Sequence, residues 1–309
     1  MKTYWNDEYC APQINFETFR KSREIAQQLS VVLRDSVVVV DPADVPSALA
    51  KANVALRDGV DPQYLSAIMT GNPTGLAASN GLGWDDGVYP MVLNSTAGIL
   101  AATDDVLAGD KVSCSLSSGL HHARRNIGRG YCTVNSLALG ALYAADKGAK
   151  VVILDLDAHC GGGTAEYIKG TKVKQVDLSV DSFDSYESDD NSSLFLSHDP
   201  LTYGDEVAKA LDAVDGIGPD VVFYNAGVDV FPHIDAMQVV DREVAVASRL
   251  RELGVRTVLV MAGGYGKYED IVPMHIATIG AFAAPEQVAR GMKVAREAIS
   301  KLVALETCQ

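Results

Sequence analysis

The sequence lacks the marks of a membrane-spanning or a disulfide-stabilised protein. Its 309 residues contain no uncharged apolar run of about 18 residues, the length that a helix needs to cross a bilayer. The 5 cysteines form no CxxC pair, and their odd number and wide spacing favour neither a disulfide framework nor a zinc finger. The first residues carry no apolar signal stretch. We therefore expect a reduced, cytoplasmic protein with no membrane partner.

Basic residues are also scarce. The chain has 26 Lys and Arg against 40 Asp and Glu, for a formal net charge of −14. A nucleic-acid-binding surface normally needs a basic patch, and the densest basic spot here is Arg124, Arg125 and Arg129. We therefore expect no nucleic-acid partner. An acidic surface instead attracts cationic substrates.

Short β-branched runs alternate along the chain with longer segments of helical period. We predict strands over 36–40, 111–115, 150–155, 172–178, 220–225 and 256–261, and helices over 46–57, 94–107, 133–147, 205–214, 242–253 and 286–303. This alternation predicts an α/β fold with a central, mostly parallel β-sheet flanked by helices. No Pro- or Ser-rich linker divides the chain, so we expect a single domain over residues 1–309. The polar, acidic stretch 179–206 is expected to form a functional loop, and the Gly- and Asn-rich stretch 70–90 a second loop.

Metal-binding residue types gather at the ends of the predicted strands, where open parallel sheets bind ligands. Asp155, Asp157 and His159 occupy every second position of one extended segment, so their side chains point to the same side. Burying all three is costly unless they pair or bind a cation. One carboxylate and the imidazole of this segment, with one further carboxylate from another strand end, would form a three-ligand site with an open position, as in catalytic zinc centres. A buried hydrogen-bond network is the alternative.

Two further motifs suit proton transfer. His121 and His122 follow the predicted strand 111–115, and histidine titrates near neutral pH, as a general acid or base must. Tyr265 follows two glycines after the strand 256–261, where its hydroxyl could donate to an oxyanion. The alternatives are an exposed or packed histidine pair and a rim aromatic. Asp229, after the strand 220–225, could equally be a turn or helix-cap residue.

Taken in order, these segments resemble the zinc-dependent histone deacetylase family, which includes acetylpolyamine amidohydrolases and acetoin-utilisation proteins. The matching segments are 94–98 (NSTAG), 119–123 (GLHHA), 130–135 (GYCTVN), 155–164 (DLDAHCGGGT), and 226–229 (AGVD) with 263–265 (GGY). The resemblance implies the three-layer arginase/deacetylase fold and a deacetylase catalytic domain. It also implies hydrolysis of an N-acyl amine at a Zn²⁺ site and a structural K⁺ ion. Fe²⁺ is the alternative metal, because a site of two aspartates and one histidine suits both ions.

The resemblance also assigns roles to individual residues. Asp157, His159 and Asp229 match the metal ligands, His122 the general base beside His121, and Tyr265 the residue that polarises the amide carbonyl. Asp155 matches the carboxylate that orients the first histidine and contacts the potassium ion, with Asp177 as a neighbour. The residues expected to bind substrate are Gly130, Tyr131, Phe183, Gly263 and Gly264.

The sequence departs from the family pattern beside the metal ligands. Cys160 stands where the family has a second histidine, and we expect a buried thiol there, with a redox-sensitive thiol as the alternative. Gly162 stands where the family has the aspartate that anchors His122. Without a carboxylate partner, His122 should be a weaker and less oriented base; Glu166 and Asp86 are candidate replacements.

Three functions remain open at this point. The first is an amidohydrolase whose substrate is an acylated amine, as a peptide or small molecule, such as acetyl-lysine, an acetylpolyamine or a small acetylated metabolite. The second is a two-manganese arginase-type ureohydrolase, but Val230 and Phe231 follow Asp229 where further carboxylates would be needed. The third is a metal-binding protein with little catalytic activity. A homo-oligomer is compatible with each of them.

Overall fold

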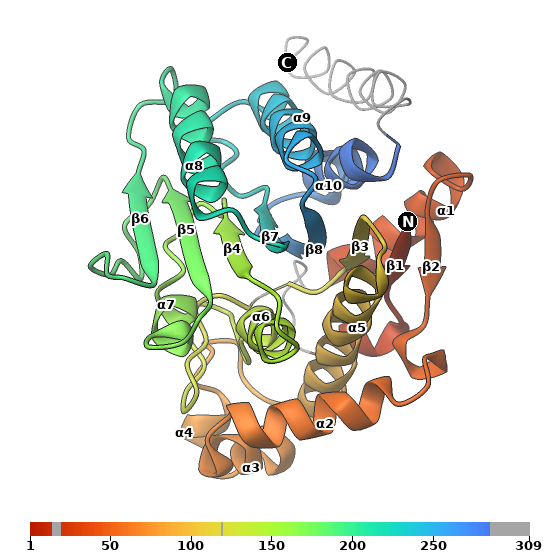
Figure 1. Cartoon of the computed structure of the whole chain (residues 1–309). Helices are drawn as coiled ribbons and strands as arrows, with labels where there is room; N and C mark the ends of the chain where they lie inside the picture. The colour runs from red at the N-terminus through yellow and green to blue at the C-terminus, as the bar shows by residue number, and fades with distance from the viewer. Residues whose placement is uncertain (14–19, 119, 285–309) are drawn as a thin grey trace, which may run out of the picture.

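The computed structural model describes residues 1–13, 20–118 and 120–284. In this part of the chain, one sheet of eight parallel strands runs in the order β2-β1-β3-β8-β7-β4-β5-β6 (Figure 1). The strands are β1 Lys2–Tyr4, β2 Val38–Val40, β3 Val112–Ser115, β4 Val151–Asp155, β5 Lys174–Ser179, β6 Ser192–Leu196, β7 Val221–Gly227 and β8 Arg256–Ala262. The predicted α/β class with a central parallel sheet is confirmed.

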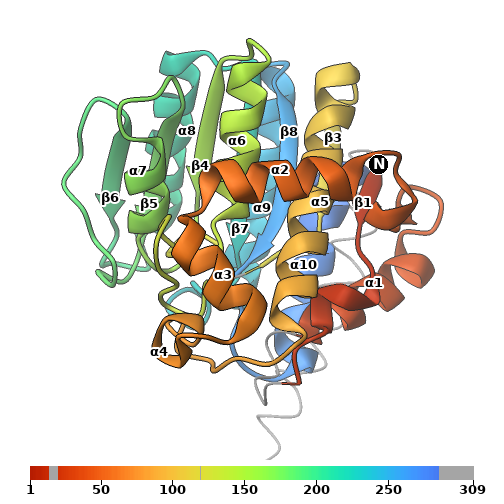
Figure 2. The same ribbon diagram turned by 90° about the horizontal axis from the view of Figure 1, so that it is seen from below.

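Helices cover both faces of the sheet and make three layers (Figures 1 and 2). One face carries α1 Lys21–Val32, α8 Tyr203–Ile217, α9 Ala236–Glu252 and α10 Tyr268–Ala283. The other carries α2 Ala48–Gly59, α3 Pro62–Thr70, α5 Val88–Ala108, α6 Ser136–Asp146 and α7 Gly162–Ile168, with the short α4 Thr74–Ala77 beyond α3. Within the described ranges, no helix has the length and apolar character needed to cross a membrane.

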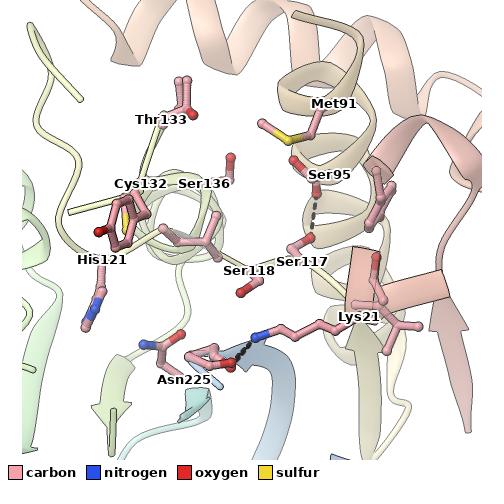
Figure 3. Close-up of a pocket in the computed structure, with 18 of the residues that line it drawn as sticks. Lys21, Met91, Ser95, Ser117, Ser118, His121, Cys132, Thr133, Ser136 and Asn225 are labelled. Atoms are coloured by element: carbon pink, nitrogen blue, oxygen red, sulfur yellow. Dashed lines mark hydrogen bonds between the residues drawn. The ribbon is translucent and has the colours of Figure 1, made fainter. Parts of the chain in front are cut away.

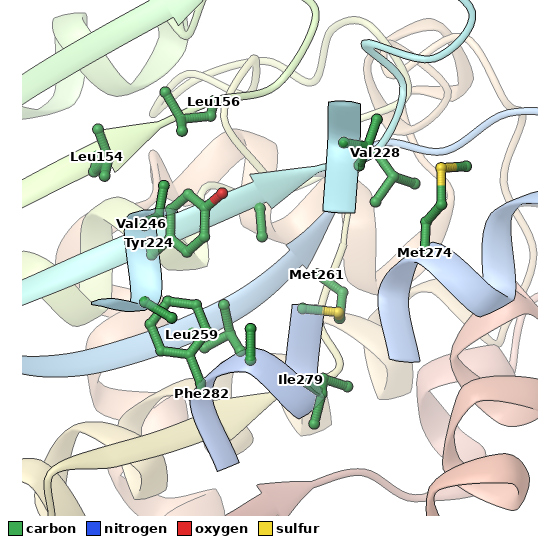
Figure 4. Close-up of a cluster of buried hydrophobic side chains, with 14 of the residues drawn as sticks. Leu154, Leu156, Tyr224, Val228, Val246, Leu259, Met261, Met274, Ile279 and Phe282 are labelled. Carbon is green, nitrogen blue, oxygen red and sulfur yellow. The ribbon is translucent and has the colours of Figure 1, made fainter. Parts of the chain in front are cut away.

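Both faces of the sheet carry apolar side chains, because successive side chains of a strand point to opposite faces. In β8, Leu259 and Met261 pack into one core, and Val258 and Val260 pack into the other. Figure 4 shows the first core, where Phe282 of α10 meets β8 and β7. Burial of each such side chain stabilises the fold by roughly 1.5–3 kcal/mol. These two cores hold the strand ends in fixed positions.

The six predicted strands are all present, and five of the predicted helices are present with changed ends. Helices α5 and α9 begin six residues before their predicted starts at 94 and 242. The predicted loop 179–206 is partly wrong, because it contains β6 and the first turn of α8; likewise 70–90 contains α4 and the start of α5. The predicted helix 286–303 and the motif residue Gly119 lie outside the described residues.

Candidate active site

Four neighbouring strands bring the candidate residues to one edge of the sheet. The strands β3, β8, β7 and β4 are consecutive, and Asp155 of β4 lies in register with Asn225 of β7. Gly227 of β7 lies in register with Ala262 of β8. Because all four strands are parallel, the segments that follow them converge at their carboxyl ends. The structure therefore brings together residues that are up to 144 positions apart, from His121 to Tyr265.

Asp157, His159 and Asp229 form a compact group whose ligand atoms all lie within 4.8 Å of one another. His159 Nδ1 is 3.2 Å from Asp157 Oδ1 and 3.2 Å from Asp229 Oδ2. Both carboxylate side chains are only 3% exposed, whereas that of His159 is 30% exposed. The group therefore sits at the bottom of an opening rather than inside a closed core.

The electrostatics of this group suit a divalent cation. Hydrogen bonds to Asp157 and Asp229 raise the pKa of His159 to about 10, and burial raises the pKa of Asp229. Oδ2 of Asp229 is buried, and His159 Nδ1 approaches it at 3.2 Å. Two buried carboxylates and an imidazole fit a three-ligand site for zinc or iron. A bound cation would replace the proton on His159, since imidazole binds metals in its neutral form.

The histidine pair lies beside this group. His121 Nδ1 is 2.9 Å from Asp155 Oδ2, and the charges of Asp155 and Asp157 outweigh the effect of burial, so that the pKa of His121 rises to about 10. His122 packs against it, with ring centroids 4.0 Å apart. Burial and the neighbouring His121 lower the pKa of His122 to about 4. His122 is therefore the neutral histidine of the pair at physiological pH, as a proton acceptor must be.

His122 has a carboxylate partner, and it is a residue that the sequence analysis did not consider. Asp184, in the loop between β5 and β6, places Oδ2 at 3.1 Å from His122 Nδ1. Neither replacement considered from sequence takes this place: Glu166 pairs with Arg124, and Asp86 has no bond to His122 among the described residues. No periodicity marked Asp184, because the contact spans 62 residues and joins two irregular segments.

Three aromatic side chains surround the opening above the ligand group. Tyr131, Phe183 and Tyr265 are each about two-fifths exposed, at 44%, 40% and 41%. The Phe183 ring meets His122 edge-on at 4.9 Å between centroids, and Tyr131 and Tyr265 are 6.2 Å apart. An extended alkyl chain could pass between such apolar walls to reach the ligand group.

The glycines expected to bind substrate make room for this arrangement. A Cβ at Gly130 would lie 2.6 Å from His122 Cδ2 and 2.9 Å from Phe183 Cε1. A Cβ at Gly263 would collide with the carboxylate of Asp229. These two glycines therefore allow the proposed base and a ligand to sit where they do. Direct contact of Gly130, Gly263 or Gly264 with substrate stays a prediction.

A cavity continues inward from the ligand group, and Figure 3 shows the side chains that line it. Lys21 of α1, 1% exposed, reaches across it and donates to the carbonyl oxygens of Ala262, at 3.0 Å, and Gly263. Burial lowers the pKa of Lys21 to about 8. Sequence reasoning missed this residue because nothing in its neighbours distinguishes it from a lysine on an exposed helix face.

Two smaller expectations concern groups below the site. Cys160 is buried, its Sγ lies 3.3 Å from the carbonyl oxygen of Asp181, and burial raises its pKa to about 12, so the buried-thiol interpretation is confirmed. Asp177 pairs in register with Asp155, and burial together with that neighbouring charge raises the pKa of Asp177 to about 8. A cation would ease the burial of these two carboxylates, but the structural potassium ion stays a prediction.

Comparisons with known proteins agree with this geometry. A model of the histone deacetylase domain matches residues 55–195. An uncharacterized protein of Picosynechococcus sp. is 28% identical over 267 residues, which cover 79% of this chain and 86% of that protein. The acetylpolyamine amidohydrolase of Mycoplana ramosa is 26% identical over 216 residues, which span 62% of each chain.

A solved structure has the same fold. The crystal structure of an acetylpolyamine aminohydrolase from Burkholderia pseudomallei matches with a TM-score of 0.73 at 19% sequence identity, over 92% of this chain and 99% of that one. The domain match and the amidohydrolase relative support a hydrolase of the deacetylase type. Residues 55–195 therefore resemble the histone deacetylase domain, in agreement with the ordered motifs of the sequence.

Proposed function

We propose that the protein is a metal-dependent amidohydrolase that removes the acyl group from an N-acylated amine. The observation that carries the proposal is the convergence of Asp157, His159 and Asp229 within 4.8 Å, beneath an aromatic opening that also presents His122 and Tyr265. Each of these side chains has a function in amide hydrolysis that follows from its position.

The ligand group would hold one divalent ion. Zn²⁺ is our proposal and Fe²⁺ the alternative, since two carboxylates and one imidazole suit both ions. When bound there, the ion would polarise the acyl oxygen and lower the pKa of water.

The residues around the ligand group would move the protons. His122, neutral and held at Nδ1 by Asp184, would accept the proton of the attacking water at Nε2. Tyr265, whose ring centroid is 6.4 Å from that of His159, would donate its hydroxyl to the acyl oxygen as negative charge develops. The histidine pair would then return a proton to the departing amine. Asp155 would hold His121 in place through the 2.9 Å contact to its Nδ1.

The expected substrate is a cationic acylated amine with a linear chain. The apolar sides of Tyr131 and Phe183 suit an alkyl chain, and the net charge of −14 favours the approach of cations. Acetyl-lysine peptides, acetylpolyamines and small acetylated amines share this chemistry. The name of the Mycoplana relative points to the same class.

The structure favours neither alternative function. Asp157, His159 and Asp229 are the only group of this kind found among the described residues, whereas a two-manganese centre needs more ligands. The main argument for a protein with little activity was an unanchored His122, and Asp184 removes it.

Acetate release tests the proposal. Zinc-loaded protein is incubated with acetyl-lysine peptides, acetylpolyamines and small acetylated metabolites, with chelator-treated protein and Asp229→Asn as controls. We expect release that both controls abolish, and the best substrate identifies its class. Stoichiometric zinc without release from any of these compounds would overturn the deacetylase proposal.

A further inference from the structure

Asp184 occupies the position from which a carboxylate can orient His122. Its side chain is 2% exposed, and its two oxygens have separate partners. Oδ2 is 3.1 Å from His122 Nδ1, and Oδ1 accepts from Arg124 at 2.6 Å. Arg124 also donates to Oδ2 at 3.2 Å, and Arg129 is 3.4 Å from Oδ1. The two arginines compensate the charge of this buried carboxylate.

The space for Asp184 exists because residue 162 is a glycine. A Cβ at Gly162 would collide with the backbone carbonyl of Asp184 and lie 2.9 Å from its Cγ. Asp184 itself has a left-handed backbone, with φ 60°, which non-glycine residues adopt only where other contacts hold them. The glycine at position 162 and the buried position of Asp184 therefore depend on each other. Without a side chain at Gly162, the β5–β6 loop can pack there and place the Asp184 carboxylate beside His122.

The hydrogen-bond directions determine which nitrogen of His122 can act. A carboxylate accepts only, so Asp184 requires a proton on Nδ1 and leaves Nε2 with a lone pair. Nε2 is the nitrogen that can then take a proton from water, because Nδ1 is already used. A neutral histidine without such an acceptor has no fixed tautomer.

We propose that Asp184 is the positioning residue of His122, supplying from the β5–β6 loop the carboxylate that residue 162 lacks. The expected effect on kcat rests on the proposed function, whereas the tautomer of His122 does not depend on it. Because Phe183 precedes Asp184, one loop carries both a wall of the substrate opening and the partner of the base.

Asp184→Asn is the sharpest test, because Arg124 decides how the amide faces. The 2.6 Å bond from Arg124 and the approach of Arg129 hold the amide oxygen in the place of Oδ1, so the amide NH₂ takes the place of Oδ2 and donates to His122 Nδ1. The proton then moves to Nε2, which can no longer accept one. We expect kcat to fall on the order of 10⁴-fold, as for a catalytic histidine held in the wrong tautomer, with KM and bound zinc little changed. Glu187→Gln, which neutralises an exposed carboxylate of the same loop, is the matched control and should keep the wild-type kcat.

A second measurement needs no activity. Histidine-selective ¹⁵N NMR of the metal-free protein should show His122 protonated at Nδ1 in the wild type and at Nε2 in Asp184→Asn. Added formate should restore part of the kcat of Asp184→Gly, because glycine accepts a φ of 60° and leaves space for a small carboxylate. An Nε2-protonated His122 in the wild type, or an Asp184→Asn variant with wild-type kcat, would overturn the proposal. Failure of the wild type to hydrolyse any substrate would count against the proposed function instead, and the spectrum would still decide the role of Asp184.

Discussion

Single side chains decide the chemistry, and Tyr265 and His122 are the two whose removal should separate catalysis from metal binding. Neither belongs to the group Asp157, His159 and Asp229. We expect Tyr265→Phe to lower kcat roughly 10²- to 10³-fold by removing one oxyanion donor, and His122→Ala to lower it roughly 10²- to 10⁴-fold. Steady-state kinetics with metal analysis checks both. Tyr131→Phe removes a hydroxyl from the same opening and should keep most activity. A loss of kcat in Tyr131→Phe equal to that in Tyr265→Phe would contradict the assignment of Tyr265 as the oxyanion donor.

Lys21 gives a prediction for pH dependence. Burial lowers the pKa of Lys21 to about 8 in the folded protein, from its ordinary value of 10.5. Between these two values the unfolded chain binds a proton that the folded chain does not, so the free energy of unfolding rises with pH in this window. The gain is up to about 3 kcal/mol. Lys21→Met removes this rise in the free energy of unfolding. Below pH 8, the difference in free energy of unfolding between wild type and Lys21→Met should be constant.

Denaturant unfolding of metal-free wild-type protein and Lys21→Met at several pH values from 7 upward measures this difference. Parallel pH profiles for the two proteins would show that the ammonium group of Lys21 is not held at a lowered pKa.

At the scale of helices and strands, the glycine that begins α7 differs from a glycine at the start of α8. A Cβ at Gly162 would collide with Asp184, whereas a Cβ at Gly204 meets nothing within 4 Å. We expect Gly162→Ala to lower the free energy of unfolding by about 1–3 kcal/mol, the usual cost of overpacking. Gly204→Ala should leave it unchanged or raise it by up to about 1 kcal/mol. Equal effects of the two substitutions on the denaturation midpoint would argue against the contact with Asp184.

The same scale shows what the sequence could predict. The strands β4, β7 and β8 are apolar runs, and short polar segments follow them, so both the strands and the ligand group were visible in the pattern. Helix α10 was missed because it is apolar on nearly every side and contains Pro273, which together remove the usual amphipathic signal. The strand β6 was missed because an edge strand needs only one partner and one covered face, and its residues read as a polar loop.

The local sequence pattern also failed to identify functional residues whose contacts depend on the path of a loop. Asp184 was invisible from sequence, since its role comes from the way the loop after β5 folds onto His122. Lys21 was invisible for a related reason: its contacts with Ala262 and Gly263 span more than 240 residues. Strand ends can be predicted from periodicity, but contacts between irregular segments require the fold.

At the scale of the whole molecule, the two cores fix four parallel strands so that their carboxyl ends deliver the ligands, the histidine pair and the tyrosine to one place. The central claim is that a single divalent ion in this place supports amide hydrolysis. A titration of metal-free protein with Zn²⁺, with bound metal and acyl-amine hydrolysis measured in the same samples, tests it most directly. The single ligand group predicts that activity rises from the background level and saturates at about one ion per chain. Full activity in metal-free protein, or saturation only at two ions per chain, would contradict the account.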